Sequence, residues 1–347
     1  MRKSKKSLIR SMLLFLVILI LTFYIIFKNQ DVTKILEIIE TIDLKYVLIG
    51  ILCMVLYFIC DAVNIRRTLT ALGEKTNLFK SIKYTLIGFF FSAVTPAASG
   101  GQPMQIYYMN KDKISVANST LTLLVNLTCM QIATISIALI SLFFNYEYMN
   151  GVLIGCFILG ILLNLSALAL LLISILSKRM TKGIINFTIK FLKFIRVKNI
   201  EQKEEKINKE LEKYHSSAIF IKNHKHVMNK TLLTTYAQFI LYYIISYWVY
   251  RAFGLSSHNI LQIASMQSVL FATTSGIPSP GAVGVSEGGF LEIFKGVYKD
   301  DMISGAMLLN RGINFYLFVL ISAIIVMIYT VKDKKEQIIE EEETKND

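Results

Sequence analysis

Two short motifs hold all four prolines of the 347-residue chain, together with seven of its eighteen glycines. The first spans residues 95–103 and the second spans residues 275–289. Proline and glycine break helices, and the helix N-termini that such breaks create carry unpaired amide groups and partial positive charge. These ends suit an anion such as a lipid phosphate. With the charged residues discussed next, the candidate binding residues are Thr95, Pro96, Gly100, Gly101, Gln102, Pro103, Pro278, Pro280, Gly281, Gly284, Ser286, Glu287 and Arg311.

Glu287, Arg251 and Arg311 are ionisable residues within strongly apolar stretches. Ionisable groups at membrane depth are expensive, and they usually pair with one another or serve a pathway. Glu287 and Arg311 could form an ion pair that locks the second motif to the last helix. Alternatively, Arg311 could hold a phosphate while Glu287 tunes it. Arg251 lies near a helix end and can snorkel, and Asp61 with the arginines at 66–67 suits an anchor at the interface.

Residues 284–288 match G-x-S-x-G, the pattern of the nucleophile elbow in hydrolases. That pattern acts in a strand-turn-helix with a base beside the serine, and we expect no strand here. Of the four histidines, only His258 could approach Ser286 from the outer side. The patterns of nucleotide-driven pumps, zinc proteases and paired-cysteine redox sites do not occur. The sequence therefore predicts no catalytic residue, no metal site and no cofactor.

The composition is typical of a polytopic membrane protein, because 54% of the residues are hydrophobic and the mean hydropathy is +0.53. The stretches 82–109 and 260–298 each carry one proline motif and lack about 20 unbroken apolar residues, so each is predicted to form a re-entrant hairpin. Packing kinks are the structural alternative, since proline and glycine are common in membrane helices. The expected fold is all-α, with about six full transmembrane helices at 8–27, 44–63, 116–144, 151–176, 231–253 and 303–331.

The formal net charge of +13 fits the positive-inside rule better than nucleic-acid binding. With both termini cytoplasmic, most Lys and Arg residues fall in inside segments, and the two hairpins enter from opposite sides, as in inverted-repeat transporters. The basic loop 177–230 would lie on an anionic inner leaflet or serve as a solvated connector, with a helix around 201–213. We expect one transmembrane domain over residues 1–331 and a charged, disordered tail at 332–347.

The order of these motifs resembles the lysylphosphatidylglycerol synthase transmembrane-region family, also called flippase-like integral membrane proteins. The resemblance extends over about residues 8–331. It rests on both proline motifs and on two residues C-terminal to the second motif. They are Thr95-Pro96 with Gly100-Gly101 and Pro103, then Pro278, Pro280-Gly281, Gly284-Val285 and Glu287-Gly288, and finally Ala306 and Arg311.

Larger members of that family carry, after this membrane region, a soluble aminoacyl transferase domain that adds lysine from transfer RNA to phosphatidylglycerol. The membrane region would then move the product to the outer leaflet and give resistance to cationic peptides. The 16 residues after position 331 are too few for such a domain. The resemblance therefore implies a flippase-like protein of the bacterial cytoplasmic membrane that translocates an anionic or aminoacylated phospholipid, or a polyprenyl-phosphate lipid.

Two alternatives for the function stay open. The protein could be a phosphatidylglycerol lysyltransferase, as the family name suggests, or a non-catalytic partner of a lipid-modifying enzyme. A homo-oligomer is a further possible partner.

The first motif departs from the family pattern at two positions. Family members often carry an acid after the two glycines and a base three residues further on, where this chain has Gln102 and Gln105. A lost ion pair or a different head group would explain both amides, so lysyl-lipid specificity does not follow.

Overall fold

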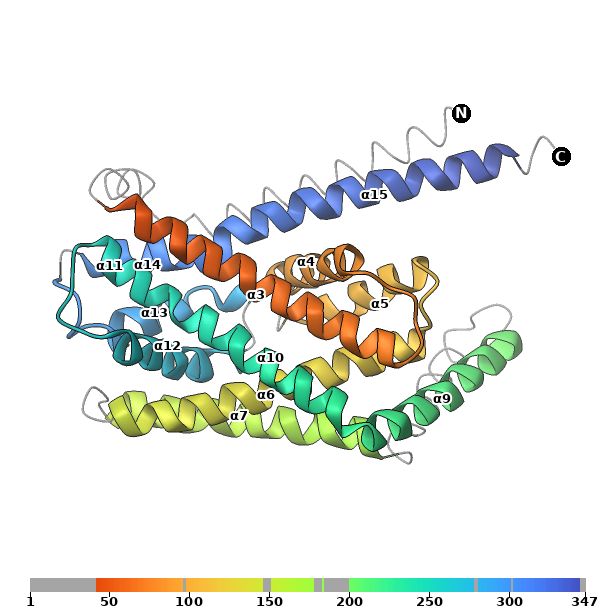
Figure 1. Cartoon of the computed structure of the whole chain (residues 1–347), viewed down its shortest axis with the longest axis horizontal. Helices are drawn as coiled ribbons and strands as arrows, with labels where there is room; N and C mark the ends of the chain where they lie inside the picture. Colours follow the sequence, from red (N-terminus) through yellow and green to blue (C-terminus); the bar gives the residue numbers. More distant parts are fainter. Residues whose placement is uncertain are drawn as a thin grey trace.

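The computed structural model describes residues 42–95, 98–145, 151–177, 183, 200–277, 280–300 and 302–343, which form helices joined by turns and loops, with no strand among them (Figure 1). The expected all-α fold is therefore confirmed for this part of the chain. The first expected span, 8–27, lies outside the described residues, as do Pro96 and Pro278.

Five helical segments in the described ranges are long and apolar enough to cross a membrane. They coincide with the five remaining predicted spans, but several boundaries differ. The predicted span 44–63 continues to Ala71, the span 231–253 begins earlier, at Lys225, and the span 303–331 continues to Glu343. The tail from residue 332, which was expected to be disordered, is therefore helical as far as Glu343. The five segments are α3 (Leu44–Ala71), α6 (Val116–Asn145), α7 (Gly151–Leu176), α10 (Lys225–Tyr243) with α11 (Ile245–Ala252), and α14 (Ile303–Arg311) with a π-helical turn η4 (Gly312–Tyr316) and α15 (Leu317–Glu343).

The segment 82–109 folds into a hairpin of two short helices, α4 (Leu78–Val94) and α5 (Gly101–Lys111). The hairpin is closed along its length by contacts between the helices. The Gln105 Nε2 donates to the carbonyl oxygen of Tyr84 at 3.1 Å, and Lys83 pairs with Asp112 at 2.5 Å. Close to the turn, a Cβ at Gly101 would lie 2.8 Å from the Gly88 carbonyl oxygen, so only glycine permits this approach.

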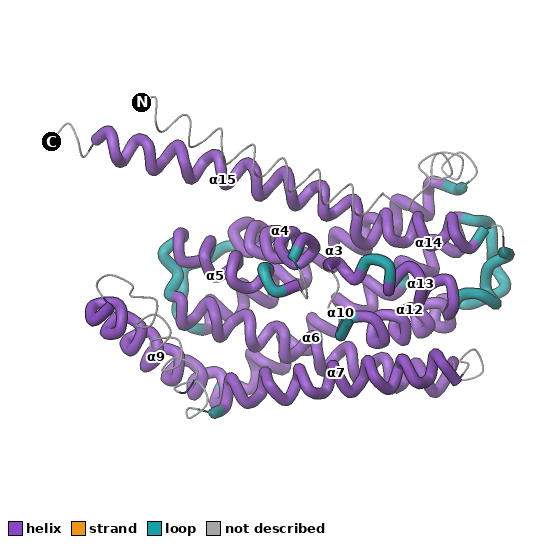
Figure 2. The backbone as a smooth tube through the Cα atoms, turned by 180° about the vertical axis from the view of Figure 1, so that it is seen from behind, coloured by secondary structure: helices purple, strands orange, loops and turns teal. Residues whose placement is uncertain are grey.

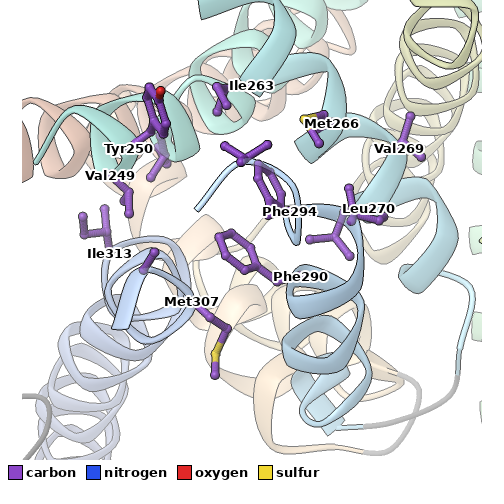
Figure 3. Packing of buried hydrophobic residues seen from close by; sticks show 14 of the residues in the cluster. Val249, Tyr250, Ile263, Met266, Val269, Leu270, Phe290, Phe294, Met307 and Ile313 are labelled. Atoms are coloured by element: carbon purple, nitrogen blue, oxygen red, sulfur yellow. The ribbon is translucent and has the colours of Figure 1, made fainter. Parts of the chain in front are cut away.

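The segment 260–298 also forms a hairpin, in which α12 (Ile260–Thr274) packs against α13 (Val285–Ile293) across the 3-10 turn η3 (Pro280–Ala282). Its apolar side is part of the largest core cluster. Figure 3 shows Phe290 and Phe294 within this cluster, with their rings stacked at 4.3 Å between centroids. Whether either hairpin enters and leaves a bilayer on one side stays a prediction.

The helix predicted around 201–213 in the basic loop is confirmed as α9 (Ile200–Asn223), which is longer than predicted. It is not only a solvated connector, because one face is buried against α6. Figure 2 shows α9 at one end of the helical bundle. That face includes Tyr214, whose hydroxyl donates to the Ser174 carbonyl oxygen at 2.8 Å, and burial raises the pKa of Tyr214 to about 12. Nearby, Glu210 Oε2 accepts from the Ala117 amide at 2.7 Å and so caps α6.

Glu74, in the connection between α3 and α4, ties three elements together at this end of the bundle. Its Oε1 accepts from Asn118 Nδ2 at 2.7 Å and from the Ser115 amide at 3.4 Å, and Lys213 of α9 lies 3.4 Å away. Burial by itself would raise the pKa of Glu74. The hydrogen bonds from Asn118 and Ser115, with the charge of Lys213, outweigh burial and hold the pKa below its usual value.

Candidate functional site

Both hairpin turns line one cavity of about 420 Å³ between the helices of the bundle. The cavity is also bordered by α3, α6, α10 and the π-helical turn η4. Two segments far apart in the sequence therefore contribute to a single site. The lining residues from the hairpins and their turns are Thr85, Gly88, Phe89, Ser92, Ala93, Ala98, Gln102, Gln105, Phe271, Thr274, Ser275, Gly276, Ile277, Gly281, Ala282 and Ser286.

Arg311 and Glu287 form a buried ion pair at one side of this cavity. Arg311 Nε donates to Glu287 Oε1 at 2.9 Å, and both side chains are 8% exposed. Arg311 Nη2 also donates to the Gly281 carbonyl oxygen at 2.9 Å, and its guanidinium lies over the Phe315 ring at 4.3 Å. An arginine has five N–H donors, so these bonds do not exhaust its capacity, and Arg311 itself lines the cavity.

The carboxylate of Glu287 also holds the second turn in shape. Its Oε2 accepts from the Gly284 amide at 2.6 Å, which caps α13, and its Oε1 accepts from the Tyr316 hydroxyl at 3.0 Å. The turn needs this support because Gly281 and Gly284 adopt positive φ angles of 58° and 85°. The ion-pair interpretation of Glu287 and Arg311 is therefore confirmed as a contact, while Arg311 also keeps access to the cavity.

Each turn contains one alanine in the left-handed region. Ala98 of the first turn and Ala282 of the second both have φ of 53°, and both line the cavity. Residues other than glycine rarely adopt such angles, which cost about 1–3 kcal/mol and concentrate at ligand-binding and switching sites. The two turns therefore share a strained backbone at the same cavity wall.

Asp61 of α3 is a cavity residue that the sequence placed at the interface instead. It is buried and accepts from Thr85 Oγ1 at 2.6 Å and from Asn126 Nδ2 at 2.8 Å, both neutral groups. No cation pairs with it among the residues that the structure describes. The correction follows from the length of α3, since a helix that continues to Ala71 places Asp61 inside the bundle. The sequence signal that could have placed Asp61 in the interior was the presence of Thr85 and Asn126, two polar residues in two other apolar segments.

Asn164 of α7 secures the broken C-terminal end of α12. Its Nδ2 donates to the Ala272 carbonyl oxygen at 3.1 Å, and its side chain exchanges hydrogen bonds with Ser275 Oγ at 3.3 Å. Irregular backbone at membrane depth is tolerated where protein groups satisfy it. The second turn is therefore anchored from both sides, by Asn164 at its start and by Glu287 at its end.

The predicted residues divide between the cavity wall and the scaffold behind it. Gln102, Gly281, Ser286 and Arg311 line the cavity, with Gln105, which also bonds to α4. Thr95, Gly100, Gly101, Pro103, Gly284 and Glu287 do not line it. Thr95 Oγ1 accepts from the Gly100 amide at 2.9 Å and so shapes the first turn. Pro280 begins η3, and nothing is assigned to Pro96 or Pro278.

The hydrolase alternative gains no support from this geometry. Ser286 lies in the first turn of α13 and not after a strand. Among the described residues no histidine lines the cavity, and His258 instead contacts Tyr250 and Ser257. No group of three or more histidine, cysteine or acidic residues in the described ranges could hold a metal ion.

Several apolar helices long enough to span a bilayer border a partly polar cavity, and their number defines a multi-pass membrane protein. The family model described as the lysylphosphatidylglycerol synthase TM region matches residues 11–322. The match covers most of the chain, so the protein belongs to this family, whose members handle membrane lipids. A search of curated proteins finds no match.

Proposed function

We propose that the protein binds the head group of a phospholipid in the cavity between the two hairpin turns and translocates the lipid across the membrane. The observation that carries this proposal is the convergence of both helix breaks on one cavity that also contains Arg311 and Asp61. Transporters place substrate sites at discontinuous helices, where backbone groups can reach the ligand. The lipid tails would stay in the bilayer while the head group enters the cavity.

The charges of the cavity favour a head group with both a phosphate and an amine. Arg311, with Ser286 beside it on the wall, would bind the phosphate. Asp61 would accept the ammonium group, because its present partners are neutral hydrogen-bond donors. An aminoacylated phospholipid carries both groups. Phosphatidylglycerol or a polyprenyl phosphate would use only the Arg311 side.

Translocation would proceed by alternating access, with the hairpins open to opposite sides of a bacterial cytoplasmic membrane and both termini in the cytoplasm. The sequence has no P-loop, so we infer movement down a gradient or coupled to ions. The basic segment with α9 would contact the anionic inner leaflet. The flippase-like domain would extend over residues 1–331.

A test of lipid movement uses purified protein in vesicles with fluorescent phosphatidylglycerol, lysyl-phosphatidylglycerol or polyprenyl phosphate in one leaflet. We expect wild type to move at least one of these lipids, and Arg311→Gln and Asp61→Asn to slow it. Arg251→Gln is the matched control, since Arg251 contacts Tyr46 at the end of α11 and does not line the cavity. If wild type moves none of the lipids, the proposal is wrong.

The enzymatic alternative rests on the family, whose name includes a synthase. It is distinguished by the lipid composition of cells with and without the protein. A change in the total amount of aminoacylated phospholipid would support synthesis. Unchanged totals with altered exposure at the outer surface would support translocation.

A further inference from the structure

A second hollow, of about 430 Å³, lies between the C-terminal turns of α3 and the first turns of α10. It is separate from the central cavity, with which it shares no lining residue. In Figure 1 these helix ends lie toward the same end of the molecule as α9. The residues that line it are Val63, Arg66, Arg67, Thr70, Ala71, His226, Val227 and Lys230.

The wall of this hollow is basic without any acidic counterpart. Arg66 and Arg67 come from α3, His226 and Lys230 come from α10, and none of the lining residues is acidic. In the described part of the chain, none of these four side chains pairs with a carboxylate. Cations gathered without counter-charges repel one another, and an anion placed among them relieves that repulsion.

Within the described ranges, the acceptors that hold Arg67 in place are neutral. Its Nη1 donates to Asn64 Oδ1 at 2.8 Å and its Nη2 donates to Thr234 Oγ1 at 3.0 Å. The bond to Asn64 lies within α3 and the bond to Thr234 connects α3 to α10. Together they fix the guanidinium at the hollow, yet neither acceptor carries a charge that compensates it. A guanidinium oriented in this way suits the planar, bidentate recognition of phosphate oxygens.

The N-terminus of α10 adds a third favourable element. Its N-cap, His224, makes no capping bond through its side chain, and no acidic residue occurs in the first turn. No acidic side chain in that turn offsets the helix dipole, and His226 of that turn lines the hollow. The candidate membrane span of α3 ends here and that of α10 begins here, and the ends of a span are the part that would reach the head-group region of a bilayer.

We propose that this hollow is a phosphate-binding site, distinct from the central cavity, that takes the phosphate group of an anionic phospholipid at the end of α3 and α10. Arg67 forms the oriented contact, and Arg66, His226 and Lys230 supply charge around it. Free inorganic phosphate shares the recognised group and is the other source of the same ligand. The site does not depend on lipid movement through the central cavity.

The test uses the full chain in maltoside micelles, which contain no phosphate, titrated calorimetrically with short-chain phosphatidylglycerol and, separately, with inorganic phosphate. The variant Arg66→Gln/Lys230→Gln removes two exposed charges and leaves the Arg67 contacts intact. We expect its Kd for the short-chain lipid to rise at least about tenfold, as for the loss of one charge-assisted contact. Lys299→Gln, an exposed lysine between α13 and α14, is the control and should bind like wild type.

Binding of both probes that the double variant weakens supports a site for the phosphate group. Binding of the lipid alone, weakened in the same way, supports the phospholipid as the source, and binding of inorganic phosphate alone supports a soluble source. Equal binding by wild type and the double variant, or no binding of either probe, overturns the proposal. The same comparison made in an Arg311→Gln background, which removes the phosphate contact of the central cavity, should still show the loss of binding caused by Arg66→Gln/Lys230→Gln, and this separates the site from the function proposed for that cavity.

Discussion

The ion pair of Arg311 and Glu287 allows a quantitative test of how the second turn is held. We consider the single substitutions Arg311→Met and Glu287→Met and the combination of both. Each single change leaves one buried charge without its main partner, since both side chains are 8% exposed and joined at 2.9 Å. Breaking a buried pair in this way costs about 3–5 kcal/mol of unfolding free energy.

The double variant should cost far less than the sum of the single changes. It removes both charges together, so no uncompensated charge is left in the interior. It does not become neutral, because the Gly284 amide loses the acceptor that Glu287 provided. An unsatisfied buried donor costs about 1–3 kcal/mol, so the double variant should lose roughly 1–3 kcal/mol against about 6–10 for additive changes.

The measurement is the free energy of unfolding in mixed micelles, followed by circular dichroism during a titration with denaturing detergent. The coupling energy from the double-mutant cycle should be at least about 2 kcal/mol. Arg251→Met, which changes an arginine that bonds to Tyr46 at the end of α11, should have a much smaller effect. Additive losses in the double variant would refute the interpretation that the two residues act as one unit.

Two further predictions concern backbone shape and protonation. Gly281→Ala and Gly284→Ala should each destabilise the protein by about 1 kcal/mol, because both glycines have positive φ angles. Gly281→Ala should cost at least about 1 kcal/mol more, because the added Cβ would clash with the Phe315 ring. At Gly284 nothing lies within 4 Å of an added Cβ. Thermal unfolding of the two purified variants compares them, and equal stability would contradict the clash. Because the pKa of Glu74 is held below its usual value, its stabilising contribution should be present above the unfolded-state pKa and be lost as the pH falls through the lowered folded-state pKa. Unfolding measured between pH 7 and pH 3 should therefore depend less on pH in Glu74→Gln than in wild type, with Asn118→Ala showing a similar reduction, and unchanged pH dependence in both would refute the assignment.

Much of the fold could be predicted because its signals are local. Apolar stretches of sufficient length predicted the spans that contain α3, α6 and α7, since spanning a bilayer requires length and composition rather than particular partners. The boundaries were less accurate. α3 continues through Arg66 and Arg67 to Ala71 because its polar residues pack between helices, for example Asn64 against Thr235 at 3.0 Å.

The candidate site was predicted in part. Helix breakers marked both turns, and Gln102, Gly281, Ser286 and Arg311 were named for the cavity wall that they form. Asp61 was assigned to the interface because its sequence neighbours include arginines, and only its hydrogen bonds to α4 and α6 place it in the cavity.

The sequence by itself determined that the protein is an α-helical membrane protein, where its helices break, and which family its motifs match. These properties depend on composition and on the conformational limits of proline and glycine along the chain. Only the tertiary structure decided that the two turns meet at one cavity, that Glu287 pairs with Arg311 while Asp61 has neutral partners, and that α9 packs on α6. Those contacts join residues far apart in the chain, and they depend on how the helices pack against one another.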